Sequence, residues 1–373
     1  MGGAGGAGEG AGGPFGAFGG ERRVTAAQFL ETISELPGIS GHEGPVAARI
    51  REAWAPLVDE IRTDPLGNVI ALKAGEGPKP RPRVMIATHM DEIGFMVLSI
   101  EQGGFLRVAP VGGIDVRNVL AHRVRVLGRR ELVGYLGMLP PHLTTDEEMT
   151  RPVPMKDLFV DVGLPEERVR ALVEPGDLVV REQRAVQLLG GRMAGKAFDN
   201  RASCAAAYHA LQELARRRHQ VDVVVVATVQ EEVGLRGAVT SAFGVAPDVG
   251  IAVDVGFARQ PGVEKDRSAE PGGGPAIALG PNIHPQVYRF LVEQAQREDV
   301  PYQVEPVPGR TGTDAWALQV ARSGVATGLL SVPLRYMHST VETVDVKDIE
   351  ATGRLLAAAL AAMEPEWVRG LSR

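Results

Sequence analysis

Several histidine and acidic side chains of this sequence stand directly after apolar runs of the chain. They are His89 and Asp91 after residues 84–88, Glu231 and Glu232 after 221–229, and Asp254 after 251–253. Imidazole and carboxylate groups, without thiolates, form a ligand set that suits zinc, cobalt or manganese. Residues two apart on an extended chain share a face, so Asp91 can reach His89 and fix the orientation of its imidazole. The pattern therefore indicates a metal site where several strands end.

Two further residues extend this set. Asp199 stands where an alanine-rich helix is expected to begin, and His338 follows another apolar run, 325–332. Each residue alone has an ordinary explanation: Asp199 could cap the helix, the Glu-Glu pair could lie in a solvated loop, and a His-x-Asp pair can arise by chance. Their shared position favours chemistry, since sites in open α/β sheets form beyond the carboxyl ends of strands. Two histidines and three acids suffice for two metal ions if one carboxylate bridges them, which leaves one acid of the Glu-Glu pair as a general base.

Alternating helices and strands must position these residues. Helical apolar spacing predicts helices at 25–36, 46–57, 199–217, 284–298, 313–322 and 346–363, and apolar runs predict strands at 68–72, 84–88, 221–229, 251–255 and 325–332. Between 94 and about 180 the helical pattern nearly vanishes, short strands alternate with turn residues, and only 165–172 predicts a short helix. Because the two flanks resemble each other and the middle does not, we expect a β-rich domain inserted into a discontinuous α/β domain.

We therefore predict the α/β fold class, with a central mixed sheet flanked by helices in the domain that carries the metal site. The two parts of this domain are residues 24–93 and 185–373, and the inserted β-rich domain comprises residues 94–184. Residues 1–23 are Gly-rich and are expected to form a disordered tail, because such a run cannot bury enough surface to offset its conformational entropy. This tail lacks the basic start and the continuous apolar stretch of a secretory signal.

Composition narrows the possible functions. The chain has 373 residues, which is too long for one ordinary core. Its net charge of −6 argues against a nucleic-acid partner, and no uninterrupted apolar run approaches the roughly eighteen residues of a membrane span. The single cysteine, Cys204, excludes an intramolecular disulfide and a multi-cysteine metal site, and we expect it to be a buried packing residue. A cytoplasmic location follows as an expectation.

The motifs around these residues resemble those of metallopeptidase family forty-two, the tetrahedral, glutamyl and deblocking aminopeptidases. The matching segments are Leu-Pro-Gly-Ile-Ser-Gly-His-Glu (36–43), Asp-Pro-Leu-Gly-Asn (64–68), Thr-His-Met-Asp-Glu-Ile-Gly (88–94), Gly-Lys-Ala-Phe-Asp-Asn-Arg (195–201), Gln-Glu-Glu-Val-Gly-Leu-Arg-Gly-Ala (230–238), Asp-Val-Gly (254–256), Gly-Thr-Asp-Ala (312–315) and Met-His-Ser (337–339). They follow the order expected for the family over about residues 36–340, which is nearly the whole chain.

This resemblance implies an aminopeptidase that removes N-terminal residues from peptides and uses two divalent metal ions per subunit. Zinc or cobalt is expected, and manganese also suits the ligands. The family pattern makes Asp199 the bridging carboxylate. His89 and Asp254 would complete one metal site, and Glu232 and His338 would complete the other.

The resemblance also assigns the remaining roles. Glu231 would be the general base and acid, acting on a water between the metal ions that attacks the peptide bond, and Asp91 would orient His89. The inserted domain would serve assembly, and the protein would be a homo-oligomer such as a tetrahedral dodecamer. No nucleic-acid or membrane partner is implied.

Other functions stay open on the residues alone. A metal-dependent carboxypeptidase, dipeptidase or deacylase could use a similar ligand cluster, and an endoglucanase would instead need two carboxyl groups and no metal. A non-enzymatic binding or assembly protein would be expected to have lost at least one ligand or the base. The sequence does not decide which N-terminal residue is preferred, although loops after Asp254 and around 280–285 and 310–314 are expected to line the pocket.

Overall fold

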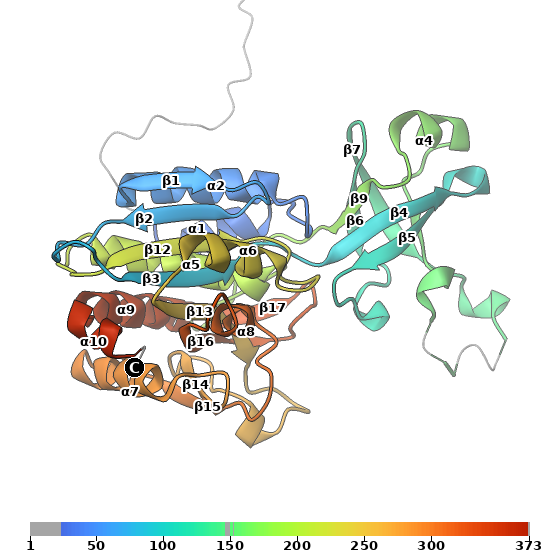
Figure 1. Ribbon diagram of the computed structural model, residues 1–373. Coiled ribbons are helices and arrows are strands. Elements are labelled where there is room, and N and C mark those ends of the chain that lie inside the picture. Colours follow the sequence, from blue (N-terminus) through green and yellow to red (C-terminus); the bar gives the residue numbers. More distant parts are fainter. Residues whose placement is uncertain (1–23, 146–149, 152, 372–373) are drawn as a thin grey trace, which may run out of the picture.

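The computed structural model describes residues 24–145, 150–151 and 153–371, so the predicted tail at 1–23 lies outside the described part of the chain. The described residues form a large layered α/β body and a small β-barrel that stands at one side of it (Figure 1). This arrangement confirms the predicted fold class, a mixed sheet flanked by helices together with a β-rich region contributed by the middle of the chain.

Four parallel strands form the centre of the large sheet. They are neighbours in the order β12 (Asp222–Thr228), β3 (Arg83–His89), β13 (Val249–Phe257) and β16 (Ala326–Arg335). Apolar, often β-branched residues dominate them, which suits strands that are covered on both faces. Shorter strands bring the sheet to eleven within the described residues: β1 (Glu60–Thr63), β2 (Val69–Lys73), β10 (Val186–Gln187), β11 (Arg192–Gly195), β14 (Ala276–Leu279), β15 (Gln303–Pro306) and β17 (Glu342–Asp345). Most of these pair in antiparallel fashion, so the sheet is mixed.

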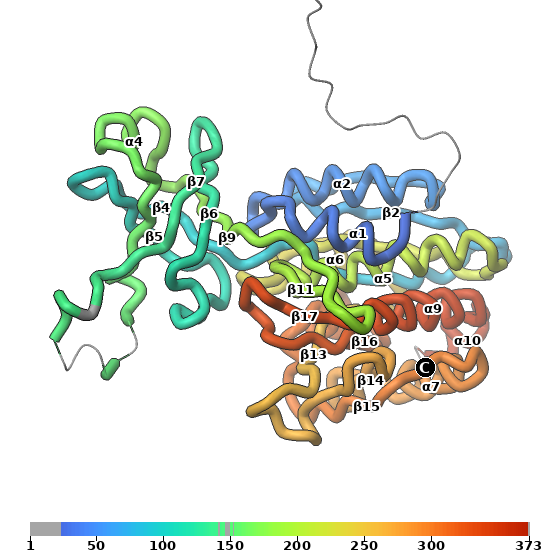
Figure 2. Tube along the Cα trace, turned by 180° about the vertical axis from the view of Figure 1, so that it is seen from behind, coloured from blue at the N-terminus to red at the C-terminus, as the bar shows by residue number. Residues whose placement is uncertain are grey.

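Helices cover both faces of the sheet because side chains alternate along each strand. In β3, Val84 and Ile86 belong to one hydrophobic core, whereas Met85 and Ala87 belong to another. The first core contains residues of α1 (Ala26–Ser34), α2 (Gly44–Trp54), α5 (Phe198–Leu214), α7 (Pro285–Arg297), α9 (Val346–Ala362) and α10 (Pro365–Gly370), and Figure 2 shows α1, α5, α9 and α7 across this face. The second core contains residues of α6 (Arg236–Val245) and α8 (Asp314–Gln319).

Helix α5 carries Asp199 at its start and packs against the sheet and against α9, which lies beside it on the same face. Small side chains in α5 permit close packing. Gly353 of α9 approaches so closely that a Cβ at this position would lie 2.8 Å from the carbonyl oxygen of Ala206. Cys204 is buried in this layer, as its surroundings predicted. The tight packing fixes the helix that brings Asp199 to the edge of the sheet.

The barrel consists of β4 (Gly94–Ile100), β5 (Leu106–Val111), β6 (Arg123–Leu127), β7 (Glu131–Gly137), β8 (Phe159–Asp161) and β9 (Leu178–Arg181), closed in the order β4-β5-β8-β7-β6-β9. Alternate residues of β7 point inward, as expected for a strand with one buried face. The predicted short helix is α4 (Glu166–Leu172). The chain enters the barrel just after β3. No helix within the described residues is long and apolar enough to cross a membrane.

Candidate metal centre

The four central strands end at one edge of the sheet, and the polar residues predicted from the sequence meet there. His89 is the last residue of β3, and Asp254 lies in the final part of β13. Glu231 and Glu232 follow β12, and His338 lies in a turn after β16. Because these four strands are parallel neighbours, their carboxyl ends come together although the residues are far apart in the sequence.

Asp199 lies at the centre of this cluster. Its Oδ1 is 3.2 Å from Nε2 of His89, and its Oδ2 is 3.3 Å from Nε2 of His338. Asp254 Oδ1 lies 3.7 Å from the same His89 nitrogen, and Glu232 Oε1 lies 3.4 Å from the same His338 nitrogen. The donor atoms therefore form two groups of three, each within 4.8 Å, that share Asp199. Asp199 does not cap α5, whose N-cap position is Ala197 without a side-chain hydrogen bond.

Asp91 is a buried residue that contacts several members of the cluster. It is fully buried, and its Oδ1 lies 3.4 Å from Nδ1 of His89, although that nitrogen makes no well-aligned hydrogen bond. The carboxylate accepts hydrogen bonds from the backbone N–H groups of Glu231 and Glu232, at 3.0 and 3.2 Å, and from the Ser40 hydroxyl at 2.6 Å. Burial opposes ionisation, but the contacts with His89, Ser40 and the backbone outweigh it and lower the pKa of Asp91. Asp91 thus positions the Glu-Glu pair as well as lying beside His89.

Burial makes this concentration of acids costly unless positive charge is present. Burial is the largest cause that raises the pKa of Glu231, to about 10, and it also raises the pKa of Glu232 and of Asp254. The pKa of His338 is raised to about 11 because Asp199 and Glu232 accept hydrogen bonds from its imidazole. Such a cluster must hold protons or cations. Carboxylates and imidazoles in two groups with one shared carboxylate fit two divalent cations.

A buried group of charged residues ties the segment just after His89 to the start of α5, which carries Asp199. Glu92 accepts hydrogen bonds from Lys196 Nζ, at 2.7 and 2.9 Å, and from Arg201 Nη2 at 3.2 Å. All three side chains are at most 1% exposed. These residues lie inside the motifs at 88–94 and 195–201 but were assigned no role from the sequence, although charged residues so close to candidate ligands indicate a supporting function.

Glu342 is a further supporting residue that no sequence pattern indicated. This buried carboxylate accepts the backbone N–H of Asp199 at 3.0 Å and that of His338 at 2.8 Å. It therefore fixes the backbone of two residues of the cluster at once. Glu342 is the first residue of the short strand β17, so it does not follow an apolar run as the predicted ligands do.

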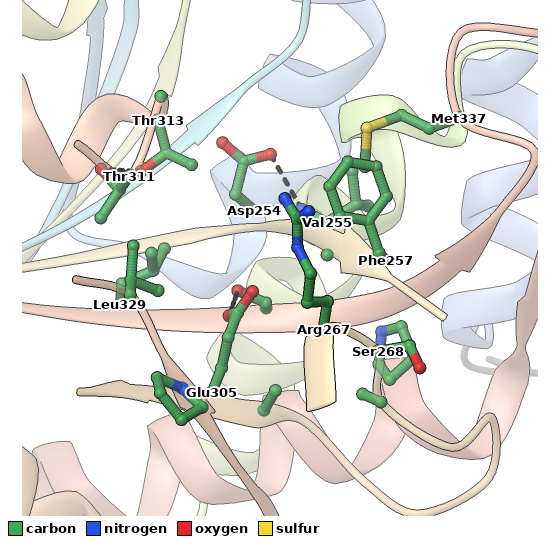
Figure 3. Close-up of a pocket in the computed structure, with 18 of the residues that line it drawn as sticks. Asp254, Val255, Phe257, Arg267, Ser268, Glu305, Thr311, Thr313, Leu329 and Met337 are labelled. Carbon is green, nitrogen blue, oxygen red and sulfur yellow. Dashed lines mark hydrogen bonds between the residues drawn. The ribbon is translucent and has the colours of Figure 1, made fainter. Parts of the chain in front are cut away.

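The cluster forms the floor of a pocket of about 1100 Å³. Figure 3 shows Asp254 with Phe257, Arg267, Glu305 and Met337 around this space. The expected loops after Asp254 and around 310–314 do line the pocket, but 280–285 does not, and residues 303–308 of β15 and the following loop take that place.

Comparison with known proteins places this geometry in a family. The model of the M42 glutamyl aminopeptidase family matches residues 67–355. The chain belongs to the M42 peptidase family. It is 39% identical to the lysyl aminopeptidase of Pyrococcus furiosus over 343 residues, which are 91% of this chain and 97% of that protein. Its structure is similar to that of an aminopeptidase from Desulfurococcus kamchatkensis, with a TM-score of 0.86, 38% identity and coverage of 93% of this chain and 98% of the other. It is also similar to the TET1 peptidase of Pyrococcus horikoshii, with a TM-score of 0.80, 30% identity and coverage of 91% and 100%.

Membership of the M42 family settles the class of reaction. The protein is a hydrolase that acts on peptides as an aminopeptidase, and the family's metallopeptidase chemistry agrees with the donor set at the sheet edge. The recognition drawn from motifs at 36–340 is therefore confirmed.

Proposed function

We propose that this M42 protein hydrolyses N-terminal residues from peptides with two divalent metal ions per subunit. His89, Asp199 and Asp254 would hold one ion, and Asp199, Glu232 and His338 the other. The observation that carries the proposal is that the two carboxylate oxygens of Asp199 face two different imidazoles, at 3.2 and 3.3 Å. Zinc or cobalt best suits these ligands, and manganese is also compatible.

Two ions at such a centre supply Lewis acidity for the scissile carbonyl and lower the pKa of a bound water. The protein's own residues then manage the proton. Glu231 lies beside His89, with 3.8 Å between Oε2 and Nε2, and belongs to neither ligand group. It would accept the proton of the attacking water and deliver it to the leaving amine. Asp91 fixes the backbone of Glu231 and so holds the base at the rim of the cluster.

Action at the N-terminus is supported by the relatives of this chain rather than by the charge of the pocket floor. Four acidic residues line that floor: Asp199, Glu231, Glu232 and Asp254. Two divalent ions would balance their charge, so the charge alone does not distinguish an aminopeptidase from a carboxypeptidase. The match to the M42 family and the similarity to the lysyl aminopeptidase of Pyrococcus furiosus support an aminopeptidase, and an endoglucanase would not need the imidazole ligands.

We further propose that the protein assembles with copies of itself and that a domain of residues 94–184 takes part in the assembly. The TET1 peptidase of Pyrococcus horikoshii assembles into a tetrahedron or a large octahedral shell. Within residues 94–184, Leu143 is 70% exposed, and Leu98 and Tyr135 are each more than half exposed. Exposed apolar residues of this kind are typical of surfaces that are covered in an assembly. A mass measurement in solution tests this point, and a monomeric mass at micromolar concentration would contradict it.

The catalytic proposal is tested with aminoacyl p-nitroanilides and their N-acetylated forms on protein stripped of metal and reloaded with zinc, cobalt or manganese. We expect hydrolysis only of the free-amine substrates, only after reloading, and two ions per subunit by elemental analysis. Asp199→Ala should lose both ions, whereas Asp266→Asn, an exposed acid at the pocket rim, should retain them. Two ions bound to Asp199→Ala would refute the bridging role.

A further inference from the structure

His338 is held by three contacts, and two of them come from the barrel region. Its Nδ1 lies 2.9 Å from the carbonyl oxygen of Gly113, in the loop after β5. Its backbone carbonyl oxygen accepts a 2.9 Å hydrogen bond from Nη1 of Arg181, the last residue of β9. The third contact is the hydrogen bond from its backbone N–H to Glu342. With these atoms engaged, Nε2 is the atom of His338 that faces the carboxylate of Asp199.

The turn that carries His338 needs such support. The φ angles of Tyr336 and His338 are 57° and 63°, in the left-handed region. For residues other than glycine this conformation is disfavoured, and it persists where surrounding contacts determine it. The contacts with Gly113 and Arg181 therefore help to hold an imidazole that the local backbone alone would not keep in place.

Arg181 is buried, so its guanidinium interacts with protein groups around His338 and not with water. Its side chain is 1% exposed, and a buried guanidinium is tolerated only where partners compensate for its lost hydration. Its hydrogen-bond partner is the carbonyl oxygen of His338, and the carboxylates of Glu342 and Glu92 lie near enough to interact with its charge. His338 and Glu342 belong to the segment that supports the second ligand group, so the end of β9 is tied to the metal centre and not only to the barrel.

Gly113 touches the same imidazole at close range. A Cβ added there would lie 3.1 Å from both Cε1 and Nδ1 of His338, and those are the contacts within 4 Å. The φ of Gly113 is not in the left-handed region, so its backbone would accept alanine. Gly113→Ala would therefore crowd the imidazole, which must shift by a few tenths of an ångström, without placing alanine in the left-handed region.

We propose that the barrel sets the geometry of the second metal site through these two positioning residues. This inference rests on the dinuclear function proposed above. Arg181 and the Gly113 carbonyl orient His338, so the affinity of the Asp199–Glu232–His338 group for its ion depends on the barrel. The affinity of the His89–Asp199–Asp254 group for its ion does not depend on the barrel, because neither Arg181 nor Gly113 contacts His89 or Asp254. Partners that orient a ligating histidine typically change metal affinity about 10- to 100-fold when they are lost.

The test measures zinc binding by full-length apoprotein, by calorimetry and by elemental analysis after dialysis against a weak chelator. The variants are Gly113→Ala and Arg181→Lys. The controls are Gly244→Ala, whose Cβ meets nothing within 4 Å, and Arg123→Met, a half-exposed barrel arginine paired with Glu182. In each test variant we expect one of two binding steps to weaken about 10- to 100-fold, with the other unchanged. Saturating zinc should restore the activity that is lost at limiting zinc.

The outcomes separate this inference from the function on which it rests. If the unmodified protein binds two ions and both test variants bind them with unchanged affinity, the barrel does not set the second site. Equal weakening of both steps would also overturn the inference, because it would indicate general loosening. If Arg181→Lys fails to fold, Gly113→Ala decides alone. Fewer than two ions on the unmodified protein would instead refute the dinuclear function.

Discussion

Replacing Glu231 with glutamine removes the proposed base while leaving the rest of the centre in place. The side chain is 9% exposed and belongs to neither group of candidate ligands. Its backbone N–H is held by Asp91 at 3.0 Å, a contact that does not depend on the side chain. Glutamine has nearly the same size as glutamate, so the variant should fold and keep its metal ions.

The expected loss follows from what the carboxylate does. General base catalysis is typically worth about 10²- to 10⁴-fold in rate, which corresponds to roughly 3–5 kcal/mol of activation free energy. Asp314 lies close enough to influence Glu231, but it is 2% exposed and accepts a 2.6 Å hydrogen bond from Thr228. It is therefore not placed to take over the proton, and we expect a decrease in kcat of at least about a hundredfold.

The assay measures kcat with an aminoacyl p-nitroanilide at saturating metal, together with metal content by elemental analysis. Glu232→Gln is the informative neighbour, because it should lose metal from one site rather than lose the base. Glu264→Gln, on an exposed loop, should leave both quantities unchanged. A kcat for Glu231→Gln within tenfold of the unmodified protein, with both ions bound, would refute the assignment, and so would loss of an ion from this variant.

Two further predictions concern stability. Glu92→Gln leaves the buried charges of Lys196 and Arg201 without their carboxylate, so it should lower the free energy of unfolding by about 3–5 kcal/mol. Glu52→Gln, in an exposed ion pair, should change the free energy of unfolding by less than about 1 kcal/mol. Chemical denaturation measures both values, and similar effects of the two substitutions would contradict the reasoning. Burial raises the pKa of Asp348 from 3.8 to about 6, so the folded protein holds a proton between these pH values that the unfolded chain has lost. Stability from this group is therefore lost as the pH rises through that window, by up to about 3 kcal/mol, and Asp348→Asn should remove this slope; denaturation midpoints that fall in parallel for both proteins between pH 4 and 7 would contradict it.

The parts of the fold that were predictable are those in which one pattern decides the outcome. The run at 221–229 is apolar and β-branched, so it had to be a buried strand, and it is β12. Short strands such as β10, at an edge of the sheet, and β17, between β16 and β11, have two and four residues and show no such pattern, because their pairing partners define them. Helix α6 was also not predicted, because the glycines at 234, 237 and 244 disfavour a helix in sequence, whereas packing against β12 and β3 stabilises it.

The polar residues divide in the same way. His89, Asp254 and the Glu-Glu pair could be predicted because parallel strands place their ends at one edge, which is a rule about topology. Asp199 was less certain from sequence, since an acid at a helix start is most often a cap. The structure shows that its side chain instead faces two imidazoles.

The residues that the sequence did not indicate share a different property, which is that they bind backbone. Glu342 accepts two N–H groups, and Arg181 donates to a carbonyl oxygen. Asp91, which the sequence did indicate as a partner of His89, has the same property, since it also accepts two N–H groups of the Glu-Glu pair. A buried charged side chain can hydrogen-bond to the backbone of any segment that passes nearby, so no regular spacing in the sequence marks its position. The cost of burying these charges is offset only if those backbone segments stay where they are. The same contacts that keep Glu342 and Arg181 tolerable in the interior therefore keep His338 in position, and the metal centre and the stability of its surroundings cannot be altered independently at these residues.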